Sequence, residues 1–123
     1  MKVLVADDSR VMRQLVVRAL RQAGYGGHDV LHAADGKEAL EAALRERPDL
    51  VLADWNLPGL AGLETLTALR AAGVGAPFGF VTADASEQVR DHARAAGAAF
   101  LIAKPFGVED FEEALAGLLP VTP

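Results

Sequence analysis

The sequence predicts an α/β domain in which a parallel β-sheet is covered by helices on both faces. Short apolar runs rich in Val and Leu alternate five times with longer segments, whose apolar residues recur at helical spacing of three and four. The runs near the start and the middle of the chain are almost continuously apolar, which is typical of strands buried on both faces. Five βα units in one chain therefore indicate a doubly wound, five-stranded sheet.

The expected elements alternate along the whole chain. Strands are predicted at Val3–Ala6, Val30–Ala34, Leu50–Ala53, Phe78–Val81 and Ala98–Ala103. Helices are predicted at Ser9–Ala23, Lys37–Arg47, Leu63–Ala72, Ser86–Ala96 and Val108–Leu119. Residues that can cap a first helical turn precede three of these helices, namely Asp8 or Ser9, Asp35 and Ser86. Gly and Pro fall at the joints, where they interrupt regular structure.

Length and composition restrict the class of protein. A chain of 123 residues suits one domain, and the absence of cysteine excludes disulfides and thiolate metal sites. Twelve basic against 17 acidic residues give a net charge of −5, which argues against a basic nucleic-acid-binding surface. No apolar run approaches the roughly 20 residues of a membrane span. We therefore expect a single cytoplasmic domain over residues 1–123, with no output domain and no membrane or nucleic-acid partner.

Residues that carry chemistry follow the ends of four predicted strands. Asp7 and Asp8 follow the first strand, Asp54 the third, Thr82 the fourth, and Lys104 with Pro105 the fifth. In open α/β sheets, ligands bind in the crevice beyond the carboxyl ends of the strands. One rim of the sheet is therefore expected to hold three carboxylates, a hydroxyl and an ammonium group.

A cluster of carboxylates at this rim has a physical consequence. Two ionised carboxylates about 5 Å apart repel by ~3 kcal/mol at an effective dielectric constant near 20. Such a cluster needs raised pKa values or a cation, and an all-oxygen ligand set suits a hard ion such as Mg²⁺. A metal, a hydroxyl and a lysine around an aspartate can handle a phosphoryl group. The alternative is that the three aspartates only cap strand ends and form turns.

Several spaced motifs together resemble one protein family. They are Leu4-Val5-Ala6-Asp7-Asp8-Ser9 with Met12-Arg13, Ala34-Asp35-Gly36-Lys37-Glu38-Ala39-Leu40, Asp49-Leu50-Val51-Leu52-Ala53-Asp54 with Pro58 and Gly62, Val81-Thr82-Ala83, and Lys104-Pro105-Phe106. In this order, the chain resembles the receiver domain of two-component response regulators, most closely the single-domain, CheY-like type. The resemblance covers essentially all 123 residues. It implies a flavodoxin-like, CheY-like fold with strand order 2-1-3-4-5.

The resemblance also implies roles at the rim. Asp54 matches the phosphoacceptor, which takes a phosphoryl group from a histidine kinase or a histidine phosphotransfer protein. Asp8 matches the direct Mg²⁺ ligand and Asp7 a ligand that acts through water, and the backbone carbonyl of Asn56 completes the ligand set. Thr82 matches the hydroxyl that follows the phosphoryl group and Lys104 the ammonium that pairs with it.

Three further expectations follow from the resemblance. The Lys104–Pro105 bond is expected to be cis. Asn56 and Asp84 occupy the positions that set the lifetime of the phosphoryl group, and both are small and polar, so a short-lived phosphorylated state is expected. The switch position three residues before the lysine usually holds Tyr or Phe, but here it holds Leu101. Either Leu101 replaces the aromatic residue or a bulge brings Phe100 into its place.

Charge is segregated between the first and last helices. The first carries Arg10, Arg13, Arg18 and Arg21 and no acidic residue, whereas the last carries Glu109, Asp110, Glu112 and Glu113 and no basic residue. In the resembled fold these helices are neighbours. The charges either pair with one another on the surface or steer an acidic kinase or phosphotransfer partner to the site.

The leading hypothesis is a stand-alone response regulator that acts in trans, through a changed binding surface or as a phosphorelay intermediate. It is a phosphoacceptor rather than an enzyme, and a monomer is expected, with dimerisation on phosphorylation left open. The alternatives are a phosphorylation-independent interaction module and a Mg²⁺-dependent phosphatase of the haloacid-dehalogenase type, whose Asp-x-Asp pattern Asp7-Asp8-Ser9 does not match. Whether the pathway is chemotaxis or another phosphorelay is left open by the sequence.

Overall fold

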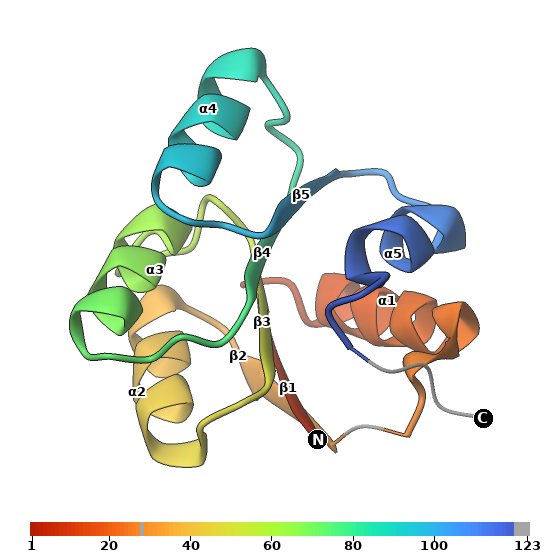
Figure 1. Ribbon diagram of the computed structural model, residues 1–123, viewed down its shortest axis with the longest axis horizontal. Coiled ribbons are helices and arrows are strands. Elements are labelled where there is room, and N and C mark those ends of the chain that lie inside the picture. The colour runs from red at the N-terminus through yellow and green to blue at the C-terminus, as the bar shows by residue number, and fades with distance from the viewer. Residues whose placement is uncertain (28, 120–123) are drawn as a thin grey trace.

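Five parallel strands form the central sheet of the computed structural model, which describes residues 1–27 and 29–119 (Figure 1). The strands are β1 (Lys2–Ala6), β2 (Asp29–Ala33), β3 (Leu50–Ala53), β4 (Phe78–Thr82) and β5 (Phe100–Ala103). They are ordered β2-β1-β3-β4-β5 across the sheet, and every pairing is parallel. The predicted fold class and strand order are therefore confirmed.

Helices cover both faces of this sheet. They are α1 (Arg10–Leu20) with a π-helical extension η1 (Arg21–Tyr25), α2 (Gly36–Glu46), α3 (Gly62–Ala71), α4 (Glu87–Ala95) and α5 (Val108–Leu115). One face is covered by α1 and α5, and the other by α2, α3 and α4 (Figure 1). No helix in the described part of the chain is long and apolar enough to span a membrane.

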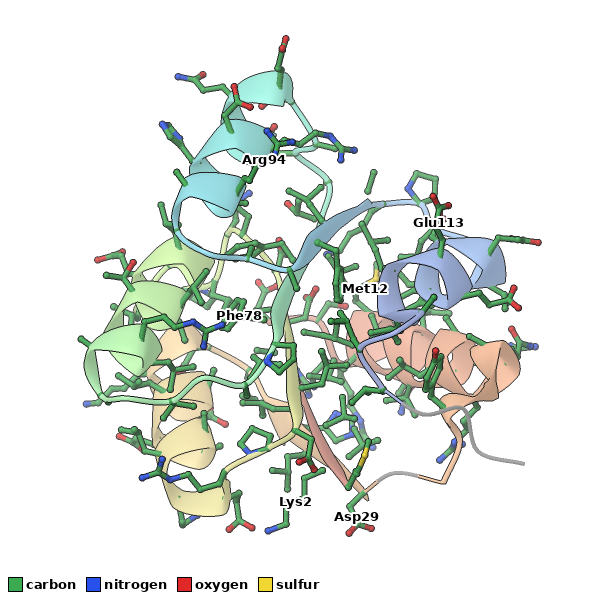
Figure 2. The ribbon with its side chains drawn as sticks, viewed as in Figure 1. Lys2, Met12, Asp29, Phe78, Arg94 and Glu113 are labelled. Carbon is green, nitrogen blue, oxygen red and sulfur yellow. The ribbon has the colours of Figure 1, made fainter. Side chains whose placement is uncertain are left out.

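Successive side chains of each strand point to opposite faces of the sheet, which divides the core into two clusters. In β1, Val3 and Val5 pack into the cluster under α1 and α5, whereas Leu4 and Ala6 pack into the cluster on the opposite face. All four residues of β3 are buried, so the central strands are covered on both sides as their apolar sequences predict. Figure 2 shows Phe78 between the sheet and the α2–α4 layer. Burial of each such large side chain stabilises the fold by about 1.5–3 kcal/mol.

The helix starts agree with the predicted caps, but two helix ends differ. The side chains of Ser9, Asp35 and Ser86 each accept a hydrogen bond from the first turn of α1, α2 and α4. The first helix continues as a π turn to Gly24, whose φ of 102° ends regular helix. The last helix was predicted to reach residue 119, but it ends at residue 115 because Ala116 is extended (ψ 122°) and Gly117 is left-handed (φ 83°).

A glycine at the start of α3 allows the loop after β3 to fold back on the sheet. The backbone N–H of Gly62 donates to the carbonyl of Trp55 at 3.1 Å. A β-carbon on Gly62 would overlap the carbonyl oxygen of Asp54 and come within 2.8 Å of the ring of Phe80. The close approach of α3 to the end of β3 therefore requires a residue without a side chain.

We predict that Gly62→Ala lowers the free energy of unfolding by about 1–3 kcal/mol, because the added methyl group forces the backbone of Asp54 to move. Gly75→Ala is the matched control, since a β-carbon there meets nothing within 4 Å and its φ is not positive. The control is expected to change stability by less than about 0.5 kcal/mol. Urea unfolding followed by circular dichroism compares them, and equal stabilities would contradict the prediction.

Candidate functional site

The parallel sheet gathers the predicted residues at one rim. The ends of β1 and β3 lie side by side, and the N–H of Asp54 donates to the carbonyl of Ala6 at 3.0 Å. β4 and β5 continue the rim, where the N–H of Lys104 donates to the carbonyl of Thr82 at 2.8 Å. Backbone pairing thus positions side chains from four strands around one crevice.

Three carboxylates cluster at this rim. Asp7, Asp8 and Asp54 each offer an oxygen, and these oxygens lie within 4.8 Å of one another. Asp7 is buried, Asp54 is half-buried and Asp8 is exposed. The Oδ1 atom of Asp7 accepts from the N–H of Ser9 at 2.9 Å, and that of Asp54 accepts from the N–H of Asn56 at 3.2 Å. These local bonds orient two of the three carboxylates.

Lys104 places a positive charge between two of the carboxylates. Its Nζ donates to Oδ2 of Asp7 at 2.8 Å and to Oδ2 of Asp54 at 3.1 Å. Partial burial lowers the pKa of Lys104, but the hydrogen bonds and charges of Asp7 and Asp54 outweigh it, so the net pKa is raised. The ammonium form is therefore favoured at this position. The Lys104–Pro105 peptide bond is cis, the isomer that the resemblance implies.

The donor set fits a hard divalent cation. All three side chains offer carboxylate oxygen, and no histidine lies in the cluster. Such oxygen ligands suit Mg²⁺, which retains several waters and takes only one or two carboxylates directly. Exposed Asp8 opens the cluster to solvent. The triad contains the three side chains that the resemblance implies as Mg²⁺ ligands.

Thr82 ends β4, and Asn56 and Asp84 follow the ends of β3 and β4 at the same rim. Thr82 is buried, and its Oγ1 accepts from the N–H of Asp84 at 3.2 Å. Within residues 1–27 and 29–119, the Thr82 side chain makes no hydrogen bond to Asp54 or Lys104. Asn56 and Asp84 are both exposed. The crevice therefore opens to water beside Asp54.

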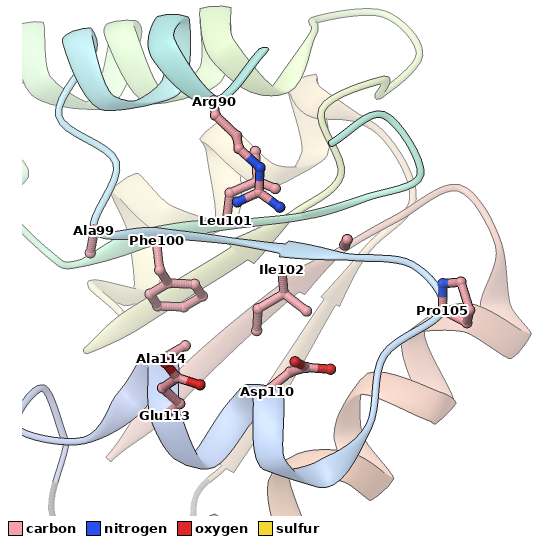
Figure 3. Close-up of a pocket in the computed structure, with 10 residues that line it drawn as sticks. Arg90, Ala99, Phe100, Leu101, Ile102, Pro105, Asp110, Glu113 and Ala114 are labelled. Carbon is pink, nitrogen blue, oxygen red and sulfur yellow. The ribbon is translucent and has the colours of Figure 1, made fainter. Parts of the chain in front are cut away.

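The structure places Phe100 and Leu101 on opposite faces of β5. Each pairs in regular register with β4, Phe100 with Gly79 and Leu101 with Phe80. The proposed bulge that would bring Phe100 into the switch position is therefore wrong. Figure 3 shows Leu101 directed toward Arg90 on α4 and Phe100 directed toward α5. The ring of Phe100 covers Gly79, where a β-carbon would overlap it.

A groove runs along β5 beside these two residues. Its volume is about 510 Å³, and it lies between α4 and α5 (Figure 3). Arg90 lines it on the α4 side, and Asp110 and Glu113 line it on the α5 side. None of the three clustered aspartates lines this groove, so it is separate from the carboxylate site.

Arg13 contributes to the site in a way that the sequence analysis missed. Its Nη1 donates to the backbone carbonyl of Asp7 at 2.6 Å, and its Nε donates to Nδ1 of His32 at 3.3 Å. Partial burial and then the charges of Arg13 and Arg10 lower the pKa of His32, which favours the neutral ring that accepts this bond. A long side chain early in a helix leans back toward its N-terminus, which is the signal that could have revealed this anchor.

The geometry agrees with similarity to known proteins. The chain is 38% identical over 117 residues to the probable transcriptional regulatory protein TcrX of Mycobacterium tuberculosis, covering 95% of this chain and 49% of that protein. It is 37% identical over 119 residues to the response regulator MprA of Mycobacterium leprae, covering 97% of this chain and 51% of that protein. The chain thus spans about half the length of these curated relatives.

Solved structures show the same fold over nearly the whole chain. The chemotaxis protein CheY4 of Vibrio cholerae superposes with a TM-score of 0.83 at 34% identity, covering 96% of this chain and 98% of that one. Residues 3–116 match the family described as the response regulator receiver domain. This match, together with a CheY-like sheet and the acidic triad at its rim, shows that the chain belongs to the receiver domain family of two-component response regulators.

Proposed function

We propose that this receiver accepts a phosphoryl group on Asp54, in a Mg²⁺-dependent reaction, from a histidine kinase or a histidine phosphotransfer protein. The observation that carries the proposal is the bridge from Lys104 to Asp54 and Asp7 within the three-carboxylate cluster. A purely structural role for these aspartates does not explain why three like charges meet at a rim open to water. Membership of the receiver family supports the same reading.

The residues divide the chemistry between them. A carboxylate oxygen of Asp54 attacks the phosphorus of the phosphohistidine, a P–O bond forms, and the P–N bond to the imidazole breaks. Lys104 stays near the acceptor and offsets the negative charge that the phosphoryl group brings. Asp7, Asp8, Asp54 and the backbone carbonyl of Asn56 would hold the metal. When bound, Mg²⁺ supplies positive charge that stabilises the phosphoryl oxygens.

The response to phosphorylation is proposed to run through Thr82 and Leu101. Thr82, whose Oγ1 accepts from the N–H of Asp84, would donate its hydroxyl hydrogen to a phosphoryl oxygen. Leu101 lies on the face of β5 that α4 covers, and it packs against the cluster that contains Phe80. Because leucine has no ring and no hydroxyl, any coupling to Thr82 relies on packing alone. The signal would then leave as a changed binding surface or by passing the phosphoryl group onward.

The matched region is about half of each curated relative, so the activities in their names belong to those proteins. We propose that residues 1–123 signal in trans, in the cytoplasm, between a histidine kinase or phosphotransfer protein and a downstream protein target. The phosphatase and the phosphorylation-independent module are alternative outcomes of the experiment below.

Trp55 is expected to report on the site by fluorescence. It follows Asp54, and its ring packs edge-on against Phe80 with centroids 5.0 Å apart. We predict a response to Mg²⁺, and a further response to beryllofluoride or a small acyl-phosphate donor that Asp54→Asn abolishes. Asp8→Asn is expected to weaken Mg²⁺ binding by about 10-fold or more, since an exposed ligand is removed.

The matched control is Asp29→Asn, which removes an exposed carboxylate at the far end of β2 and should leave every response unchanged. Circular dichroism establishes that each variant is folded. Turnover of many phosphoesters would favour the phosphatase instead. Folded protein that responds to none of these ligands, by fluorescence or by mass, would refute phosphoryl acceptance and favour the phosphorylation-independent module.

We predict that the phosphorylated chain loses its phosphoryl group within seconds to minutes. Asn56 and Asp84 are exposed, small and polar, so neither shields the bond to Asp54 from water. Asn56→Leu is expected to lengthen the half-life several-fold, whereas the small polar control Asn56→Ser should stay near the parent. Gel separation of the phosphorylated form measures the decay, and a parent half-life of hours would rule this reading out.

A further inference from the structure

The surface formed by α1, η1 and α5 carries opposite charges on two neighbouring helices. Arg10, Arg18 and Arg21 are exposed on the first, and the segment from residue 10 to residue 25 contains no acidic residue. Exposed acidic residues cover α5, which contains no basic residue: Glu109, Asp110, Glu112 and Glu113. The two helices lie side by side on the same face of the sheet (Figure 1).

These charges are not paired with each other inside the molecule. Among the residues that the structure describes, no ion pair joins α1 or η1 to α5. Arg13 is engaged with Asp7 and His32, and Asp110 accepts from the N–H of Gly107. The surface pairing considered from the sequence is therefore absent from this part of the chain. Both the basic and the acidic helix keep their charges available for a partner.

An apolar seam separates the two charged stripes. Val11 is 65% exposed and Leu15 is 43% exposed, so α1 presents two aliphatic side chains to solvent. A hollow of about 240 Å³ lies beside Leu15 and Arg18, between α1 and the start of α5. Leu15, Phe106 and Val108 line this hollow. The face thus combines a basic stripe, an apolar seam and an acidic stripe in that order.

We propose that this α1–α5 face binds the same face of a second copy of the chain, with α1 of each protomer against α5 of its partner. A partner that is simply acidic would be attracted by α1 but repelled by the adjacent α5. A second copy places its acidic α5 against the basic α1, and its basic α1 against the acidic α5. The charge pattern is therefore self-complementary, as a two-fold contact requires.

The direction of the symmetry axis follows from the same charges. Both helices begin beyond the carboxyl ends of parallel strands, so they run in the same direction along the sheet. A two-fold axis along the seam, parallel to the helices, places α1 opposite α5 of the other protomer. An axis across the helices would instead place basic α1 on basic α1, which is repulsive. Leu15 and Val108 would meet their counterparts near the axis.

Paired charge reversals test this arrangement in the unphosphorylated chain of residues 1–123. The variant Arg18→Glu with Arg21→Glu places acidic side chains on both helices at the contact. The variant Glu109→Arg with Glu112→Arg places basic side chains on both. We predict that the parent self-associates and that each variant alone associates about 10-fold or more weakly, because each altered charge occurs twice in the contact. An equimolar mixture of the two variants is expected to restore association as a heterodimer, measured by sedimentation velocity.

The controls carry the same charge changes on the opposite layer. Arg45→Glu with Arg94→Glu, and Glu41→Arg with Asp91→Arg, alter exposed residues on α2 and α4. They should associate like the parent. Circular dichroism and the Mg²⁺ response of Trp55 establish that every variant is folded. Higher salt should weaken the parent contact, since exposed charges are screened.

A parent chain that stays monomeric up to about 1 mM would overturn the proposal and leave the face to a different protein. Association that survives both reversals, or a mixture that fails to associate, would overturn it as well. The contact does not depend on phosphoryl transfer, so Asp54→Asn should associate like the parent. Failure of phosphoryl acceptance and failure of self-association are thereby measured separately.

Discussion

The ammonium group of Lys104 joins the first, third and fifth strands at a single point. It reaches Asp7 across 97 positions of sequence and Asp54 across 50. Without a cation there, two carboxylates would face each other in a partly buried crevice, which is costly. The order of the strands, the register between β1 and β3, and the turn after β5 all have to be correct for this contact to form. The rest of the rim is built around it.

The same arrangement leaves part of the carboxylate cluster accessible to solvent. Lys104 engages Asp7 and Asp54, whereas Asp8 remains exposed and free of the ammonium group. Arg13, near the start of α1, donates to the backbone carbonyl of Asp7, and the N–H of Ser9 donates to the Asp7 carboxylate, so this residue is held at two points. One half of the cluster is therefore fixed by the protein, and the other half faces solvent. That asymmetry suits a site that exchanges a metal ion and admits a phosphoryl donor.

The two layers of helices give the molecule two different surfaces. The layer of α2, α3 and α4 adjoins Leu101, whose packing is the route proposed for the response to phosphorylation. The layer of α1 and α5 carries the segregated charges and an apolar seam. Since the carboxylate rim borders both helix layers, phosphorylation of Asp54 would take place close to both surfaces.

By itself, the sequence determined the five βα units, the buried central strands and the polar residues that follow four of the strands. These are local properties: apolar periodicity, capping residues such as Ser9 and Asp35, and the position of each residue at a strand end. Strand order and the residue roles came from the resemblance, because no local pattern encodes them. Tertiary structure alone decided which carboxylates Lys104 engages, that Arg13 anchors Asp7, and that Leu101 rather than Phe100 faces α4. Each of these depends on register and packing between segments far apart in the chain, which a one-dimensional pattern does not specify.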